Sequence, residues 1–443
     1  MTAPPDDERR PRFIREPPWY QAAIVLIVGV FGALVAWDIP RSDWWRGYDS
    51  WAHSLYAEIV AGSHRLPTSA ESTEWHTPPA WHVVVGELQR LIGGRLDPVQ
   101  QTGQWVAAAC GVLLTLVVLA LARELWPERR ALHLTALGIV AFSPALVRAS
   151  AMYHPETMAT LLGTLGLLYA ARSLRANGGW AVWSMVSAFF FGLGVLTRAW
   201  VWPIALGALV LLTAAALLRT SPGGWRRLAL FAAVLTALSA PWLAHQRIEY
   251  GSAFAFNRPS VSPIGSRPAG FFLGPHVLDV FDRPIPPRLR NELVPQLYSD
   301  WWGDFFLAWD VDETAGSRLS MVPDHVTEIR SRQSVVGLLP TILALAGVVA
   351  IGLLAATRRD PRLALVPLPV ALFGLAFLWF QLKHPVSDAD TIKGTYALSV
   401  LPGLAISAAY AAETLARTSR IAALLLAGAA ITLLAMQARF LIL

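Results

Sequence analysis

Residues Gly103–Arg123 have the sequence GQWVAAACGVLLTLVVLALAR, and this stretch decides the class of protein. It carries no charged side chain before Arg123, and one helix of about 20 such residues crosses a hydrocarbon core of about 30 Å. Inside that core the backbone groups must bond to one another, which favours a helix. The stretch therefore predicts a membrane-spanning helix.

Similar apolar runs recur on both sides of this stretch, and we predict about eleven transmembrane helices. The expected spans are Tyr20–Asp38, Gly103–Arg123, Ala131–Val147, Pro155–Ser173, Trp180–Thr197, Ala199–Leu218, Trp225–Arg247, Val335–Ala356, Leu363–Leu382, Thr395–Leu415 and Ile421–Phe440. Only 15% of the 443 residues are charged and 55% are hydrophobic, whereas a soluble domain has about 25% charged residues. The predicted fold class is an all-α polytopic membrane protein.

The net charge of +6 comes almost entirely from arginines that lie in short clusters between the apolar runs. If the N-terminus is cytoplasmic and the sides alternate, most clusters fall inside, and the short outer segments hold only Arg148, Arg198, Lys383, Lys393 and Arg439. This bias follows the positive-inside rule and predicts a multi-pass protein of the cytoplasmic membrane. No basic stripe interleaved with aromatic residues lies outside the apolar runs, so nucleic acid is not an expected partner.

This topology divides the chain into a cytoplasmic polar tail (1–19), a transmembrane core (20–247), a second outer loop (248–334) and C-terminal transmembrane helices (335–443). The first outer loop, residues 39–102, belongs to the core. Trp51, Leu55 and Ile59 are spaced as on one helical face, and Thr77-Pro78-Pro79 is typical of a helix start. The loop therefore predicts two amphipathic helices at the membrane surface. The second loop is long enough to favour a functional role.

Polar groups concentrate in the first outer loop. Asp49 and His53 are four residues apart and would share one face of a helix. Such a carboxylate and imidazole could deprotonate a hydroxyl or hold a divalent cation. The alternative is an N-capping Asp49 with a solvated His53. The single Cys110 excludes both a disulfide framework and a thiolate metal site.

Several motifs resemble one family in order and in topological side. They are the run from Asp49 to Gly62, Leu66-Pro67, Glu74-Trp75-His76-Thr77-Pro78-Pro79, Tyr153-His154-Pro155-Glu156-Thr157, Leu196-Thr197-Arg198, Lys393-Gly394-Thr395-Tyr396 and Leu401-Pro402. The chain thus resembles the GT-C glycosyltransferases, in the branch of protein O-mannosyltransferases and lipid A aminoarabinose transferases. The resemblance covers roughly residues 20–410.

The resemblance implies a GT-C-type fold and a glycosyltransferase that takes its sugar from a polyprenyl-phosphate donor at the outer face. The acceptor would be an extracytoplasmic glycan, lipid or protein. Asp49 would be the general base, assisted by His53, and a single-base displacement implies inversion. His76 stands near the position where many relatives carry a lysine before the two prolines, and the resemblance makes it a candidate for binding the donor phosphate.

The leaving phosphate needs a cation, and Lys393 and Arg198 are the candidates in outer segments. For Lys393 the alternative is a lysine that extends to the membrane interface. The candidates for substrate binding are Glu74, Tyr153, Glu156, Trp301 and Asp304. Glu156 is alternatively a partner of the helix dipole, and the tryptophans of Asp300-Trp301-Trp302-Gly303-Asp304 are alternatively interfacial anchors.

The metal requirement stays open, with Asp49, His53 and His76 as the ligands if a divalent cation binds. Two rival functions also stay open: a multi-span transporter or lipid-intermediate flippase, and a ligase-like or acyl-transferring membrane enzyme. Transporters usually contain two similar halves with interrupted helices, and no matching halves are visible in this sequence. The sequence also contains no Walker loop, no His-Glu-x-x-His motif and no Gly-x-Ser-x-Gly motif.

Overall fold

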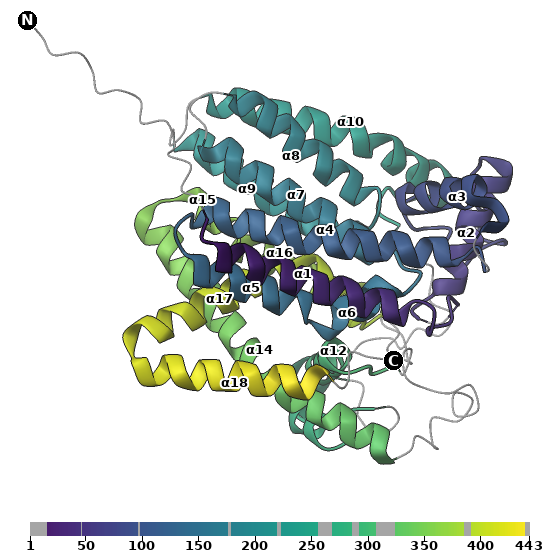
Figure 1. The fold of residues 1–443 in the computed structure, drawn as a ribbon. Helices are drawn as coiled ribbons and strands as arrows, with labels where there is room; N and C mark the ends of the chain where they lie inside the picture. The colour runs from purple at the N-terminus through teal and green to yellow at the C-terminus, as the bar shows by residue number, and fades with distance from the viewer. Residues whose placement is uncertain are drawn as a thin grey trace, which may run out of the picture.

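The computed structural model describes residues 16–45, 47–95, 98–175, 179–218, 223–255, 268–285, 292–306, 324–384 and 391–438. Within these ranges every regular element is a helix (Figure 1). The elements are α1 Pro18–Asp38, α2 Ser50–Ser63, α3 Ala80–Ile92, η1 Gly93–Arg95, α4 Gln101–Leu125, α5 Arg130–Ala141, α6 Pro144–Ala151, α7 Glu156–Arg175, α8 Trp180–Val195, η2 Ala199–Val201, α9 Trp202–Leu217, α10 Gly224–Tyr250, α11 Ala269–Leu273, η3 Val277–Phe281, α12 Leu293–Trp302, α14 Asp324–Arg358, α15 Pro361–Ala364, α16 Pro367–Lys383, η5 Gly394–Val400, α17 Leu401–Thr418 and α18 Arg420–Ala438.

Seven of the described helices are long and apolar enough to cross a membrane, and an eighth is counted if α5 and α6 form one broken span. The prediction of an all-α, multi-pass membrane protein is therefore confirmed. The predicted number of eleven spans is not. Three predicted spans correspond to α7, α8 and α18. The described parts of these helices are not both long and apolar enough to count as membrane-crossing helices.

The predicted span Ala131–Val147 is broken, because α5 and α6 meet at an angle of 53°. Ser143 has an extended backbone and Pro144 opens α6. Proline has no backbone N–H to donate and is suited to a helix start, so the chain turns here and does not continue straight. α6 is consequently a short helix whose residues are all buried.

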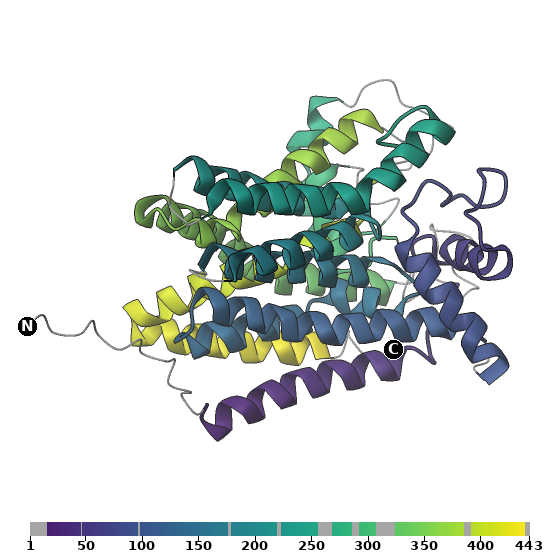
Figure 2. The same cartoon turned by 90° about the horizontal axis from the view of Figure 1, so that it is seen from above.

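α7 is enclosed within the bundle, where it packs against α4 and α8. Its buried residues include Glu156, Thr157, Thr160, Thr164 and Ser173. These polar residues lower its hydropathy, and the neighbouring helices replace lipid as its surroundings. In Figure 2, α1 lies at the edge of the bundle, beside α4.

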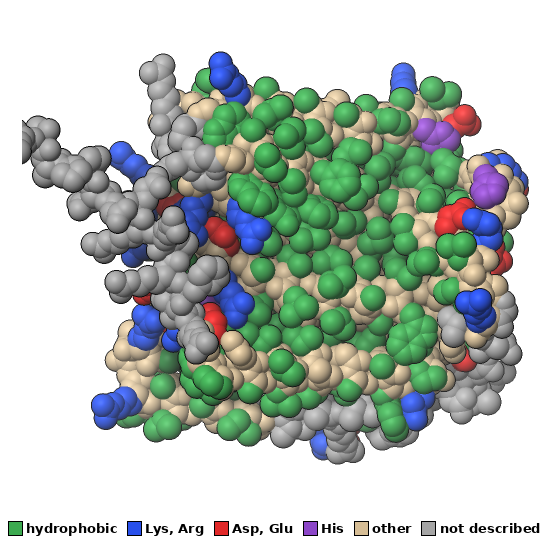
Figure 3. All heavy atoms as spheres, turned by 45° about the horizontal axis from the view of Figure 1, so that its top comes forward, with side chains coloured by type: hydrophobic (Ala, Val, Ile, Leu, Met, Phe, Trp, Pro, Cys, Tyr) green, Lys and Arg blue, Asp and Glu red, His purple; other side chains and the backbone are tan. Residues whose placement is uncertain are grey.

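One face of the bundle is apolar between two charged ends. Figure 3 shows hydrophobic side chains in a continuous band over one face, with charged side chains gathered toward the ends. α1 begins at the end of the bundle opposite to the one that carries α2 and α3 (Figure 1). This arrangement suits a helix bundle whose apolar band faces lipid.

The first loop forms the two predicted helices, α2 and α3. Trp51 is exposed on α2, whereas His53, Tyr56 and Ala57 are buried. A Cβ atom on Gly86 of α3 would lie 2.5 Å from the carbonyl oxygen of Ala57. The two helices therefore pack backbone to backbone on their small and polar residues, and this close approach turns His53 inward.

The described parts of the second loop contain the short helices α11, η3 and α12. The flanking spans are longer than predicted: α10 extends to Tyr250 and α14 begins at Asp324, ten residues before the expected end of the loop at Ser334. α12 packs against α6, α14 and η5. The second loop therefore lies at the same end of the bundle as the first loop, where Tyr48 bonds to Asp300 of α12.

Candidate active site

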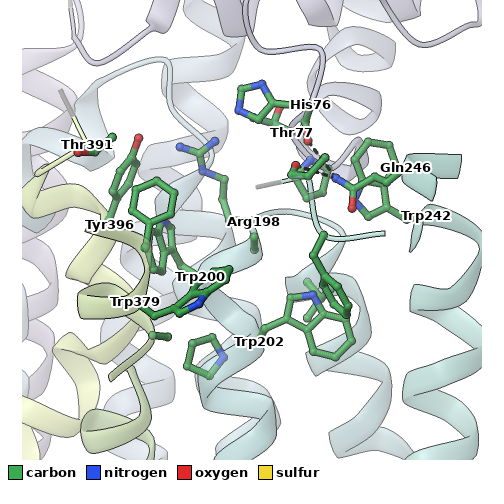
Figure 4. A pocket seen from close by; sticks show the side chains of 18 of the residues that line it. His76, Thr77, Arg198, Trp200, Trp202, Trp242, Gln246, Trp379, Thr391 and Tyr396 are labelled. Atoms are coloured by element: carbon green, nitrogen blue, oxygen red, sulfur yellow. Dashed lines mark hydrogen bonds between the residues drawn. The ribbon is translucent and has the colours of Figure 1, made fainter. Parts of the chain in front are cut away.

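A cavity of about 530 Å³ lies between the first loop and the helices α9, α10 and α16. Its polar lining residues are Asp49, Glu74, His76, Thr77, Arg198, Gln246, Thr391, Lys393 and Tyr396. Its apolar lining residues include Trp200, Trp202, Pro203, Leu206, Trp242, Leu372, Leu375, Trp379 and Phe380. In Figure 4, Arg198, His76 and Tyr396 lie near one end, with Trp202 and Trp379 toward the other. The cavity is thus shaped for an amphiphile.

Asp49 and Lys393 form an ion pair at the polar end, although 344 residues separate them in the sequence. The ammonium of Lys393 donates to Oδ2 of Asp49 at 2.7 Å. Only 3% of the Lys393 side chain is exposed, so it does not extend to the membrane interface, whereas 33% of the Asp49 side chain remains open to the cavity. The carboxylate is therefore held by a cation and still accessible to a ligand.

Asp49 directly precedes α2 but does not cap it by a side-chain hydrogen bond. Its backbone has φ 59° and ψ 19°, a left-handed conformation that is uncommon for a residue with a Cβ atom. Such strain is concentrated at functional sites. The carboxylate is turned toward Lys393 and away from the amides of α2.

The pKa of Asp49 results from opposing effects. Burial raises the pKa of this carboxyl, but the positive charge of Lys393 and its hydrogen bond outweigh burial and hold the pKa below its ordinary value. His154 and Arg198 act in the same direction as Lys393. Asp49 is therefore ionised at neutral pH, as a general base must be before it accepts a proton.

Arg198 is held by two carboxylates. Its Nε donates to Oε1 of Glu156 at 2.7 Å, and its Nη1 lies 3.6 Å from Oε2 of Glu74. The guanidinium carbon also lies 5.7 Å from the centre of the Tyr396 ring. Glu156 is fully buried behind Arg198 and does not line the cavity, whereas Glu74 and Arg198 do.

His53 is fully buried in a group of three histidines. Its Nδ1 shares a hydrogen bond of 3.1 Å with Nε2 of His82, and its ring centre lies 5.2 Å from that of His154. Burial, with the charge of Arg198, lowers the pKa of His53 well below its ordinary value. His53 is therefore a neutral imidazole and is not solvated.

The ligand set left open by the sequence does not assemble. Among the described residues no group of three or more histidine, cysteine, aspartate or glutamate side chains could hold a metal ion. Asp49 is directed to Lys393 and His53 to His82, while His76 lines the cavity separately. The described residues therefore do not bring Asp49, His53 and His76 together as a metal centre.

Besides Glu156, three other predicted substrate-binding residues do not line the cavity. Tyr153 is fully buried and contacts Gln89 and Trp81, where it joins α3 to the bundle. Trp301 packs against the main core. Asp304 is buried and lies 3.7 Å from Arg330 of α14. They contribute to the packing of the two loops.

Sequence reasoning missed the aromatic end of the cavity. Four tryptophans line it: Trp200 in η2, Trp202 at the start of α9, Trp242 in α10 and Trp379 in α16. Trp379 is 47% exposed, and two other apolar lining residues, Leu206 and Leu375, are 45% and 64% exposed. These lining side chains are therefore not covered by other described parts of the protein.

This fold and site define the class: the chain is an all-helical, multi-pass membrane protein with a GT-C fold. The oligosaccharyltransferase of Archaeoglobus fulgidus in the apo form superposes with a TM-score of 0.55 at 14% identity, over 94% of this chain and 54% of the other. The structure of the same organism's oligosaccharyltransferase AglB, in complex with an inhibitory peptide and a dolichol-phosphate, gives 0.55 at 14% identity, over 95% and 55%. This chain spans about half the length of those proteins, and at this identity the likeness is one of fold.

The sequence itself matches a family of enzymes over part of its length. Residues 90–245 match the dolichyl-phosphate-mannose-protein mannosyltransferase family. ArnT from Cupriavidus metallidurans bound to undecaprenyl phosphate also aligns, at 17% identity over 90% of this chain and 79% of the other, with a TM-score of 0.44. No curated protein matches. The expected resemblance to GT-C superfamily glycosyltransferases is confirmed, and the family match and fold support a membrane transferase.

Proposed function

We propose that the protein transfers one sugar from a polyprenyl-phosphate donor to a hydroxyl of an extracytoplasmic acceptor. The observation that carries this proposal is a cavity that joins an ionised end, with Asp49, Lys393 and Arg198, to an aromatic end whose lining side chains are partly exposed. A polyprenyl-phosphate sugar is an amphiphile whose reactive carbon lies at headgroup depth. Its two parts match the two ends of the cavity.

The prenyl chain would lie against Trp202, Trp379 and Leu375, and the phosphate beside Lys393 and Arg198. An ammonium has three donors and binds phosphate as a compact charge, whereas a guanidinium offers a planar pair of donors. The lining residues Asp49, Glu74, Lys393 and Arg198 carry two negative and two positive charges. The phosphate is therefore attracted by the position of the cations and not by an excess of positive charge.

Asp49 would act as the general base. When the donor phosphate accepts a hydrogen bond from Lys393, Lys393 stabilises the Asp49 carboxylate less. The proton affinity of Asp49 then rises. The acceptor oxygen then attacks the anomeric carbon, the carbon–oxygen bond to phosphate breaks, and its electron pair stays on the phosphate. The acceptor proton goes to Asp49. One displacement inverts the anomeric centre.

His53 would assist by position. As a buried neutral imidazole next to Glu74, at 3.9 Å, it keeps the inner face of α2 fixed behind Asp49. The arginine bias of the sequence favours an active site on the outer face of the cytoplasmic membrane. The sugar would then be attached to polyprenyl phosphate elsewhere, before the donor reaches this face.

The test gives purified protein in lipid vesicles a panel of radiolabelled polyprenyl-phosphate sugars, with a membrane extract as the source of acceptors. The expected result is that one donor loses label from the lipid fraction to an acceptor. A flippase would move the labelled lipid across the bilayer and leave the label on it. Binding of polyprenyl phosphate without any loss of label, across the whole panel, would refute transfer.

A further inference from the structure

Asp300, near the end of α12 in the second outer loop, joins segments from both sides of the candidate site. Its side chain is 1% exposed. Oδ1 accepts a hydrogen bond of 2.6 Å from the hydroxyl of Tyr48, and Oδ2 accepts one from the backbone N–H of Gly394. One buried carboxylate thus receives a donor from the first loop and a donor from η5.

Both hydrogen-bond donors are adjacent in sequence to a residue of the Asp49–Lys393 ion pair. Tyr48 directly precedes Asp49, and Gly394 directly follows Lys393. A Cβ atom on Gly394 would lie 2.9 Å from the backbone nitrogen of Trp301 and 3.0 Å from the carbonyl carbon of Asp300. Glycine therefore allows the Lys393 segment to lie directly against the end of α12.

Two further contacts fasten α12 in this position. Gln296, one turn before Asp300, donates its Nε2 to the carbonyl oxygen of Ile392 at 3.2 Å. The guanidinium of Arg148 on α6 donates to the carbonyl oxygen of Asp300 at 2.7 Å. The second loop is thus tied both to the bundle and to the residue on the other side of Lys393.

We propose that Asp300 is a positioning residue for the transfer reaction: it sets the placement of Asp49 against Lys393, and so makes the catalytic pair depend on the docking of α12. This inference rests on the proposed function. Asp300 does not line the cavity, so it acts through the segments that it holds. A purely structural role would lower stability without a specific effect on the pair.

The pH dependence distinguishes these two roles. Burial, opposed in part by Arg148, Tyr48 and the N–H of Gly394 and assisted by Asp304, raises the pKa of Asp300 to about 6. Below that pH the protonated group keeps one acceptor and becomes a donor toward Tyr48, so both contacts persist as weaker neutral hydrogen bonds. Burial holds the pKa of His53 and His154 well below the ordinary value, and the pKa of Asp49 is lowered by Lys393, so these groups titrate below this range.

The experiment compares Asp300→Asn and Asp300→Ala in the full chain, with Glu292→Gln and Glu292→Ala as matched controls. Glu292 is a buried acid at the other end of α12, and among the described residues its carboxylate bonds to His276, within the second loop. Wild-type transfer should fall about tenfold as the pH drops through about 6 and then level off. Asp300→Asn should stay near that lower level at every pH, and Asp300→Ala should lie below it.

A double-mutant cycle with Lys393 supplies a second measurement that does not require turnover. Binding of polyprenyl phosphate should weaken about tenfold in Asp300→Ala, and much less when Lys393 is already methionine, because the two residues act through one contact. Equal losses in both backgrounds, or a pH profile that Asp300→Asn leaves unchanged, would overturn the inference. Absence of binding and transfer in the wild type would instead refute the proposed function.

Discussion

The substitution Lys393→Met tests the ion pair most sharply, because methionine keeps an unbranched apolar side chain of nearly the same length and removes the ammonium. Lys393 is 3% exposed and donates to Asp49 at 2.7 Å. A hydrogen bond to a charged group contributes about 1.5–3 kcal/mol, which corresponds to a loss of about ten- to a hundredfold in donor affinity. An exposed ion pair would contribute only about 0–1 kcal/mol.

Lys393→Met should lower the free energy of unfolding by less than the loss of one partner from a fully buried ion pair would. Removing one partner of a fully buried pair costs about 3–5 kcal/mol because the other charge is left uncompensated. One third of the Asp49 side chain is open to the cavity, where water can solvate it, so we expect a decrease of roughly 2 kcal/mol in the free energy of unfolding. The pKa of Asp49 should rise, since Lys393 is the main group that lowers it.

The assay is equilibrium binding of polyprenyl phosphate to the detergent-solubilised protein, with thermal unfolding measured on the same sample. Lys383→Met is the matched control, because Lys383 is the chain's other lysine and is exposed at the end of α16. It should bind like the wild type. If Lys393→Met binds polyprenyl phosphate with unchanged affinity and is equally stable, Lys393 does not bind the phosphate.

Two further predictions concern orientation and the apolar end of the cavity. In a variant without Cys110, Ser69→Cys should react with an impermeant thiol reagent in intact cells, whereas Arg175→Cys should react only after permeabilisation; the reverse pattern would place the site on the cytoplasmic side. Trp379→Ala should weaken binding of long-chain polyprenyl phosphate by about tenfold and binding of a short-chain analogue much less. The control Trp105→Ala, on the exposed surface of α4, should affect neither. Equal effects on both chain lengths would show that the prenyl chain does not bind at this end of the cavity.

The class of fold could be predicted from the sequence because an apolar run in a membrane has only one stable local structure. The number of spans could not, since length and hydropathy do not reveal what surrounds a helix. α7 contains buried threonines and Glu156 that its neighbours enclose. The Ser143–Pro144 break lies inside an apolar run and becomes visible only as the 53° bend between α5 and α6.

The residue types of the candidate site could be predicted from the sequence, but their contacts could not. Asp49 and Lys393 were both singled out, yet nothing in a single sequence indicates that residues 344 positions apart form a pair. Asp300 stands among tryptophans that resemble interfacial anchors, and its role emerges only from the docking of α12. The tryptophans of the cavity likewise resemble lipid-facing aromatic residues until three helices bring them together.

Transfer by Asp49→Asn, compared with the wild type under saturating donor, tests the central claim most directly. The amide keeps the size of the carboxylate but cannot accept the acceptor's proton, and general base catalysis contributes about 10²–10⁴-fold. We expect turnover to fall by that order while the variant still folds and binds polyprenyl phosphate. His53→Ala should be milder, because His53 acts by position. Sugar transfer by Asp49→Asn at the wild-type rate would contradict the account.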